Sequence, residues 1–238
     1  MAMLRGVSLI VPALNEAGVI GATLRELPWD FLSECIVVDN GSTDATAEEA
    51  RRQGARVVSE PRRGYGRACY AGVLAADPAS QVLAFMDGDG SDMSCDLPRL
   101  ASPVLQGEAD FVLGSRLLGE MEPGSLLASQ VFAAWLMGQL MRRSIGVNYT
   151  DMGPMRVISR TAMQRMQMSE MTYGWNIEMQ IRAAQMGLRI RELPTGCRRR
   201  RGGTSKVSGS FIASVKAATR ILQVHYRLRK APAETFQA

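Results

Sequence analysis

The chain has 238 residues, of which 46% are apolar and 21% charged, with a formal net charge of +5. This composition is typical of a globular protein with a substantial core and excludes a disordered or fibrous chain. The positive charge favours an anionic partner, and the four cysteines lack the paired spacing of metal ligands. The amino terminus lacks a signal-peptide layout and the apolar stretch 126–141 is interrupted by polar residues, so we expect a cytoplasmic protein without a transmembrane span.

Short apolar runs alternate with helical patterns through the first half of the chain. Strands are expected at 7–12, 35–39, 56–59, 82–86 and 111–115, with helices between them. Ser42 or Thr43 is the expected N-cap of the second helix. Strands that alternate with helices predict an α/β fold with a mainly parallel, doubly wound sheet flanked by helices.

Polar side chains follow the ends of these strands, at Asn15, Asp39, Asp87, Asp89 and Arg116. In doubly wound sheets, ligands bind outside the carboxyl ends of the strands, where these side chains converge. Two carboxylates can share a hard cation such as Mg²⁺, which binds through one or two carboxylates plus substrate phosphates. The aspartates therefore predict a metal and diphosphate site. The alternative, a solvated Asp-Gly turn, does not account for the convergence.

The second half of the chain is helical, rich in methionine and basic at its end. The stretch 124–143 is either core packing or an apolar surface for a lipid. A loop at 149–156 leads into a short strand, a helix is expected over 175–186, an edge strand over 188–194 and a cationic loop over 198–206. A final helix, about 210–229, places on one face the residues Phe211, Val215, Ala218 and Leu222. It is either an interfacial amphipathic helix or a helix docked on its own domain, and His225 is expected at its surface.

Five motifs in order resemble those of a known family. They are Val11-Pro-Ala-Leu-Asn-Glu16, Val38-Asp-Asn-Gly-Ser-Thr-Asp44, Asp87-Gly-Asp89, Gly114-Ser-Arg116 and Arg200-Arg-Gly-Gly-Thr-Ser-Lys206. The chain resembles inverting glycosyltransferases of family 2, which have the GT-A fold, particularly the dolichyl- or polyprenyl-phosphate mannose and glucose synthase branch. It departs from many members in having Gly90-Ser-Asp-Met after the paired aspartates, in place of His and two Pro, and it has no counterpart of their C-terminal membrane spans.

The resemblance implies a nucleotide-sugar donor, GDP- or UDP-linked, and Mg²⁺ or Mn²⁺ held by Asp87 and Asp89, with Ser91 as the positional candidate for a third contact. It assigns to the donor pocket Pro12, Ala13, Asn15, Glu16, Asp39, Gly41, Ser42, Gly64 and Gly88. Asp39 would contact the base or ribose. Arg116, Arg200 and Lys206 would serve the acceptor phosphate or the departing diphosphate.

The acceptor implied by the resemblance is a polyprenyl or dolichyl phosphate. The basic amphipathic pattern of the final helix separately predicts peripheral contact with an anionic membrane. A phosphate acceptor is ionised near neutral pH and needs positioning more than a base. A hydroxyl acceptor would need a base, for which Asp151 and Glu178 are the candidates. Asp151 is otherwise a turn residue, and Glu178 an exposed residue in the first turn of a helix.

We expect residues 1–206 to form one GT-A catalytic domain, with a nucleotide-sugar half at 1–116 and an acceptor half at 117–206. Residues 207–238 would form a basic amphipathic helix and tail. Alternatives are a family 2 enzyme acting on a hydroxyl, a non-catalytic nucleotide- or lipid-binding relative, and a nucleotidyltransferase. A nucleic-acid partner is not expected, because carboxylates at the strand ends repel phosphates.

Overall fold

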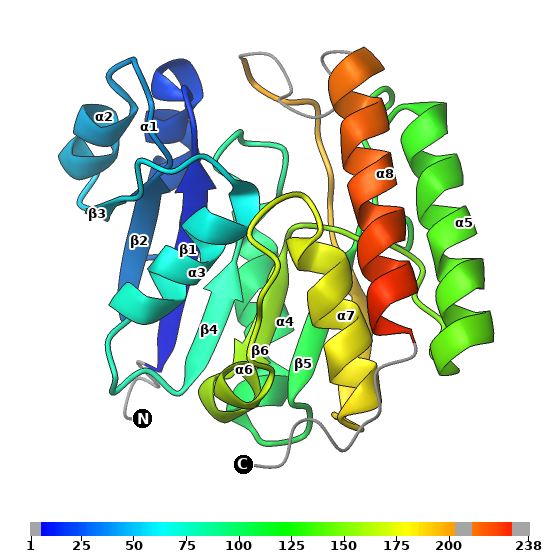
Figure 1. Ribbon diagram of the computed structural model, residues 1–238. Helices are drawn as coiled ribbons and strands as arrows, with labels where there is room; N and C mark the ends of the chain where they lie inside the picture. Colours follow the sequence, from blue (N-terminus) through cyan, green and yellow to red (C-terminus); the bar gives the residue numbers. More distant parts are fainter. Residues whose placement is uncertain (1–5, 203–210, 230–238) are drawn as a thin grey trace.

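The computed structural model describes residues 6–202 and 211–229 and, over them, a seven-stranded sheet covered by helices (Figure 1). The strands are β1 (Val7–Ala13), β2 (Glu34–Asp39), β3 (Arg56–Ser59), β4 (Val82–Phe85), β5 (Phe111–Ser115), β6 (Arg156–Ser159) and β7 (Ile190–Pro194). Their order is β3-β2-β1-β4-β6-β5-β7, and β6 runs antiparallel to both of its neighbours while the other pairs are parallel. The prediction of a mainly parallel α/β sheet is confirmed.

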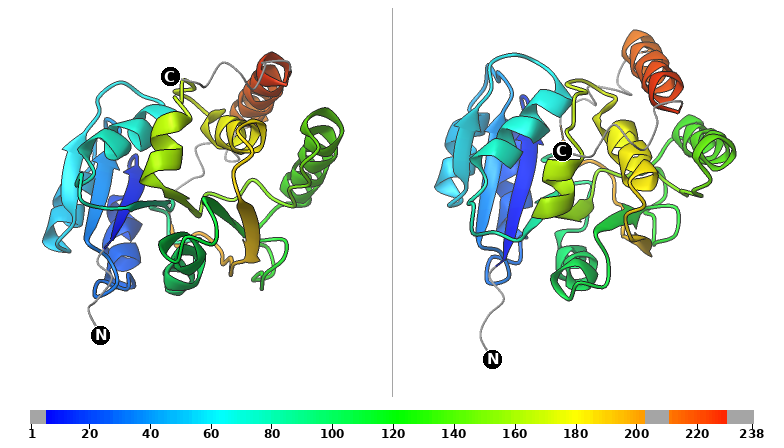
Figure 2. Two further views of the ribbon diagram at one scale, coloured as in Figure 1. Left: turned by 90° about the horizontal axis from the view of Figure 1, so that it is seen from below. Right: turned by 60° about the horizontal axis from the view of Figure 1, so that its bottom comes forward.

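Helices cover both faces of this sheet (Figure 2). They are α1 (Ala17–Arg25), α2 (Thr46–Arg52), α3 (Tyr65–Ala75), α4 (Leu97–Leu105), α5 (Ala128–Ile145), α6 (Arg160–Arg165), α7 (Trp175–Gln185) and α8 (Phe211–Leu228), with a 3₁₀ turn, η1 (Ser94–Asp96), before α4. Side chains alternate along each strand, so Leu9 and Val11 join one core with α1, α2 and α4, while Ile10 joins the other with α3, α6 and α7. Burial on both faces explains why the strands read as unbroken apolar runs.

The final helix, α8, is docked on its own domain. Arg220 of α8 binds the buried Glu170, at 2.7 Å between Nη2 and Oε2, and the Gln185 amide of α7 donates to the Leu228 carbonyl at 2.7 Å. His225 is buried, and its Nε2 lies 2.9 Å from the Ser144 hydroxyl of α5, so the prediction that it lies at the surface is wrong. The local sequence did not reveal this burial because it depends on α5, 81 residues away.

The apolar face predicted for α8 is not the docked one. Val215, Ala218 and Leu222 are exposed, while Ala217 and Val224 face the core; the side chain of Phe211 lies outside the described residues. The helix is thus docked on the domain, one of the two alternatives expected, and keeps these apolar groups outside, while its contact with a membrane stays a prediction. Within residues 6–202 and 211–229, no helix has both the length and the apolar character to cross a bilayer.

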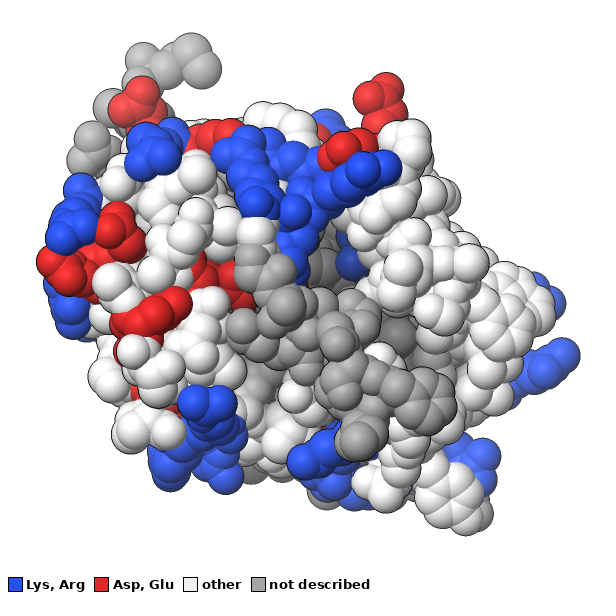
Figure 3. Space-filling model, turned by 90° about the horizontal axis from the view of Figure 1, so that it is seen from above, with Lys and Arg blue, Asp and Glu red and all other residues white. Residues whose placement is uncertain are grey.

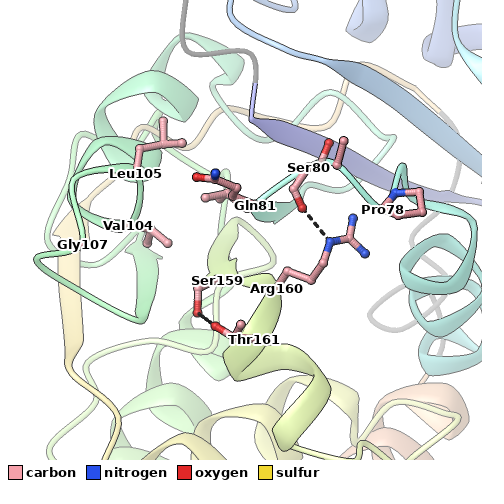
Figure 4. Close-up of a pocket in the computed structure, with 11 residues that line it drawn as sticks. Pro78, Ser80, Gln81, Val104, Leu105, Gly107, Ser159, Arg160 and Thr161 are labelled. Carbon is pink, nitrogen blue, oxygen red and sulfur yellow. Dashed lines mark hydrogen bonds between the residues drawn. The ribbon is translucent and has the colours of Figure 1, made fainter.

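A cavity of about 430 Å³ lies at the amino end of β4, away from the polar strand ends (Figure 4). It is lined by 78–82, 104–105, 107 and 159–161, and the Arg160 side chain inside it donates to the Ser80 carbonyl at 2.6 Å. The cationic group of this cavity is therefore bound to the backbone that forms its wall.

Candidate active site

The candidate site lies where β1, β2 and β4 end together. In the parallel register Pro12 lies beside Val38, and Ala13 lies beside Asp39. Asp87 follows shortly after β4, the other neighbour of β1. Parallel strands carry their carboxyl ends to one edge of a sheet, which brings these loops together. Figure 3 looks down on this edge, where acidic and basic side chains gather around a hollow.

The loops after β1 and β2 are held together by side chains predicted to bind the donor. The backbone N–H of Asn15 donates to the Ser42 hydroxyl at 2.9 Å, and the Asn15 side-chain oxygen accepts from the Thr43 N–H at 2.8 Å. Asp39 accepts from the Ser42 N–H at 3.0 Å. Asn15 has a φ of 53°, in the left-handed region that asparagine tolerates better than most residues. The prediction that Ser42 or Thr43 caps a helix is wrong, because α2 begins only at Thr46 and their polar groups bind the first loop instead.

Asn40 is a structural residue whose role was not predicted from the sequence. Its side-chain amide donates to the carbonyls of Glu60 and Arg62, both at 2.9 Å, and its oxygen accepts from the Gly64 N–H at 2.8 Å. Gly64 has a φ of 152°, and a Cβ there would lie 2.3 Å from the Met171 carbonyl oxygen. Gly64 therefore joins two loops closely, and its role in donor binding stays a prediction. The sequence indicated a role for Asn40 by its position inside the second motif, between predicted site residues.

The paired aspartates are held in place by their neighbours. Tyr65 of α3 donates its hydroxyl to Asp87 at 3.1 Å, and the Asp87 N–H donates to Asp92 at 3.1 Å. One Asp89 oxygen accepts from the Ser91 N–H at 2.8 Å and from its hydroxyl at 2.6 Å. In the described structure Ser91 thus supports Asp89, and its metal contact stays a prediction. Gly41 lies in the loop after β2, and Gly88 packs over Ile20 between the two aspartates.

The electrostatics of this loop suit a cation. Burial, together with the Asp89 carboxylate, raises the pKa of Asp87 to about 7, and burial raises the pKa of Asp92 well above its usual value. A divalent cation would relieve the repulsion between the carboxylates. Among the residues described, no group of three or more His, Cys, Asp or Glu side chains is arranged to hold a metal. Asp87 and Asp89 therefore fit a cation whose remaining ligands include substrate phosphate oxygens.

Cationic groups face these carboxylates from later in the chain. Arg200 reaches Glu16 at 3.0 Å and Asp89 at 2.7 Å, and so joins the first motif to the paired aspartates. Arg116 binds Asp151 through two contacts of 2.8 and 2.9 Å, and its N–H donates to the same carboxylate at 3.0 Å.

The two candidate bases are both engaged in other contacts. Although burial opposes ionisation of Asp151, the Arg116 guanidinium lowers its pKa below the usual value. Glu178 is buried, accepts from the Ser169 and Glu170 N–H groups at 3.0 and 2.6 Å, and binds Arg182 at 2.8 Å. The expectation of an exposed first-turn Glu178 is wrong, because this carboxylate anchors the loop before α7. Lys206 lies outside the described residues.

The sheet is mainly parallel, and the loops after β1 and β2 lie beside the paired aspartates that follow β4. This arrangement is typical of the GT-A fold of sugar-nucleotide transferases. The family model "Glycosyl transferase family 2" matches residues 8–167, about two thirds of the sequence. The chain therefore belongs to glycosyltransferase family 2.

Relatives agree with this family assignment, and a solved structure agrees with the fold. An uncharacterized glycosyltransferase of Mycobacterium tuberculosis is 39% identical over 213 residues, which cover 89% of this chain and 94% of the relative. The undecaprenyl-phosphate mannosyltransferase of Micrococcus luteus is 31% identical over 216 residues, covering 85% and 88%. The crystal structure of M. tuberculosis glucosyl-3-phosphoglycerate synthase with Mn²⁺, UDP-glucose and phosphoglyceric acid superposes with a TM-score of 0.77 at 23% identity, covering 96% of this chain and 81% of that one. That likeness shows the GT-A fold.

Proposed function

We propose that the protein is a metal-dependent, inverting glycosyltransferase that moves a sugar from a GDP- or UDP-sugar to a polyprenyl-phosphate acceptor. The observation that carries the acceptor assignment is an exposed apolar face on α5, which follows the catalytic end of β5. The undecaprenyl-phosphate mannosyltransferase of M. luteus, named for a lipid phosphate, supports the same class of acceptor.

The donor would bind along the ends of β1, β2 and β4. The Asn15–Ser42 contacts hold the two nucleotide loops in register, and the Asp39 carboxylate accepts N–H or O–H groups from the base or ribose. Asp87 and Asp89 would hold Mg²⁺ or Mn²⁺ with the donor diphosphate. When bound, the cation neutralises charge that develops on the leaving nucleoside diphosphate.

The acceptor would enter on the side of Arg116 and Arg200. A phosphate monoester has its second pKa at about 6 and is largely ionised at neutral pH. Its oxygen then attacks the anomeric carbon from the face opposite the diphosphate, which inverts the configuration. Because Asp151 is bound to Arg116, a phosphate acceptor, which needs no base, suits this site better than a hydroxyl acceptor. The Arg116 guanidinium binds the acceptor phosphate and aims it at the sugar, while Arg200 lies close enough to the paired aspartates to serve the departing diphosphate.

The lipid chain requires an apolar route out of the site. Large apolar side chains are exposed on the loop before α5 and on α5 and α8: Leu118, Met121, Leu127, Phe132, Trp135, Leu136, Val215, Leu222 and Tyr226. The rings of Phe132 and Trp135 lie 5.8 Å apart. Exposed cations on the same two helices, Arg142, Arg143, Lys216 and Arg227, complement anionic lipid head groups. This surface, the α5–α8 face, would rest on an anionic membrane.

The proposal is tested by incubating the purified protein with radiolabelled GDP- and UDP-sugars and Mn²⁺, with and without polyprenyl phosphate in detergent. We expect label to enter the organic phase only when the lipid phosphate is present. A dolichol or polyprenol without phosphate is the control acceptor and should stay unlabelled. Label that enters only water-soluble products would contradict the lipid acceptor, and would favour a hydroxyl acceptor.

A further inference from the structure

Four consecutive arginines, Arg198 to Arg201, follow β7, and they do not share one role. Arg198 and Arg201 both bind Glu26, and Arg199 donates to the Pro123 carbonyl at 2.7 Å. Arg200 turns into the candidate site instead, where its two terminal nitrogens reach different carboxylates.

The segment that carries Arg200 is hydrogen-bonded along the metal loop. The Arg198 N–H donates to the Ser91 carbonyl at 3.0 Å, and the Arg201 N–H lies 3.4 Å from the Asp89 carbonyl. Asp92 and Cys197 form an antiparallel bridge between the same two stretches. Arg200 is therefore held opposite Asp89 by backbone contacts on both sides of it.

Both oxygens of Asp89 are occupied in this arrangement. Ser91 binds Oδ1, and the Arg200 Nη2 lies 2.7 Å from Oδ2. The side chains of Glu16 and Asp89 are only 7% and 10% exposed, so water screens their charges weakly. A divalent cation that ligates Asp89 must either take the oxygen that Arg200 holds or sit beside a guanidinium, where like charges repel.

We propose that Arg200 takes the cation's place at Asp89 while the donor is absent, and is displaced when metal and diphosphate arrive together. This inference rests on the proposed function, in which Asp89 is a metal ligand. Metal alone competes with Arg200 and binds weakly. With the diphosphate present, the displaced guanidinium gains a phosphate partner, so the two ligands bind cooperatively. The position of the Arg200 side chain in the segment 197–202 therefore depends on whether the donor is bound.

The experiment measures Mn²⁺ affinity without nucleotide, by electron paramagnetic resonance of free Mn²⁺, in the wild-type protein and in four variants, of which Asp89→Asn tests the metal site itself. Arg200→Gln removes the competing charge and should bind Mn²⁺ about tenfold more tightly, given the strength of charge interactions at weakly hydrated sites. Arg200→Lys keeps the charge and should stay within about threefold of the wild type, since lysine also acts as a cation. Arg199→Gln, which loses the same charge outside the site, should also change little. Addition of UDP or GDP should tighten Mn²⁺ binding more in the wild type than in Arg200→Gln.

Two outcomes would overturn the inference in different ways. If Arg200→Gln binds Mn²⁺ no more tightly than the wild type, while Asp89→Asn still weakens binding, Arg200 does not compete with the cation although the metal site stands. If Asp89→Asn leaves Mn²⁺ affinity unchanged, the metal assignment itself fails, and the role of Arg200 fails with it. Thermal melts of each variant establish that the protein remains folded.

Discussion

Removal of the two aromatic rings from α5 should weaken membrane binding. Phe132 and Trp135 are 59% and 55% exposed. Aromatic side chains each offer about 150–250 Å², so the two rings present on the order of 170–280 Å² to solvent. At about 25 cal/mol per Å² this area is equivalent to ~4–7 kcal/mol on full insertion. Insertion of half the area corresponds to about 2–3.5 kcal/mol, or at least a ~30-fold loss of vesicle affinity in a Phe132→Ser, Trp135→Ser double variant.

The assay is co-sedimentation with vesicles of phosphatidylcholine containing one quarter phosphatidylglycerol. Leu74→Ser is the matched control, since Leu74 is 70% exposed on α3, outside the α5–α8 face. The control should bind as the wild type does, and all variants should keep the wild-type melting temperature because the altered groups are exposed. Equal vesicle binding by the double variant and the wild type would refute the membrane assignment of this face.

Three further changes test the site and its supports. Tyr65→Phe removes a hydroxyl that donates to Asp87. The variant should bind nucleotide in the presence of Mn²⁺ about tenfold more weakly, because loss of a contact that orients a metal ligand commonly has this effect. Unchanged titration curves would show that the Tyr65 hydroxyl does not support Asp87. Asp151→Asn leaves Arg116 without its carboxylate, which costs about 3 kcal/mol for a buried pair and should lower the melting temperature by roughly 6–12 °C; an unaltered melt would count against the pair. Burial lowers the pKa of His225 below 6.5, so as the pH falls the unfolded chain binds the proton before the folded chain does. The docking of α8 should therefore weaken between pH 7 and pH 5. Hydrogen exchange in α8 should show this pH dependence, and His225→Gln should reduce it.

The sheet and its polar edge were predictable because they depend on local signals. Apolar runs such as 82–86 end abruptly at polar residues, here Asp87, and the parallel connections bring those ends together without further information. The close contacts between the loops after β1 and β2 follow from this geometry. Asn15 and Ser42, 27 residues apart, meet because their strands are neighbours.

The contacts that depend on distant partners were not predictable. Asp151 lies 35 residues from Arg116, and nothing near either residue indicates that they form a buried pair. Glu178 has the local pattern of an exposed first-turn acid, yet the loop before α7 buries it. His225 is buried only because α5 and α8 meet. In each case tertiary packing, rather than the local pattern, determined the environment of the ionisable group.

The most direct test of the account is sugar transfer from the donor by Asp89→Asn, with Asp30→Asn as control. Asp30 is an exposed carboxylate in the turn between α1 and β2, away from the polar strand ends. With Mn²⁺, a nucleotide-sugar and polyprenyl phosphate, the wild type and Asp30→Asn should transfer label at similar rates. Asp89→Asn should lose at least about a hundredfold, the order expected when groups that stabilise a leaving anion are removed. Transfer by Asp89→Asn at the wild-type rate would contradict the claim that this carboxylate holds the cation against the donor diphosphate.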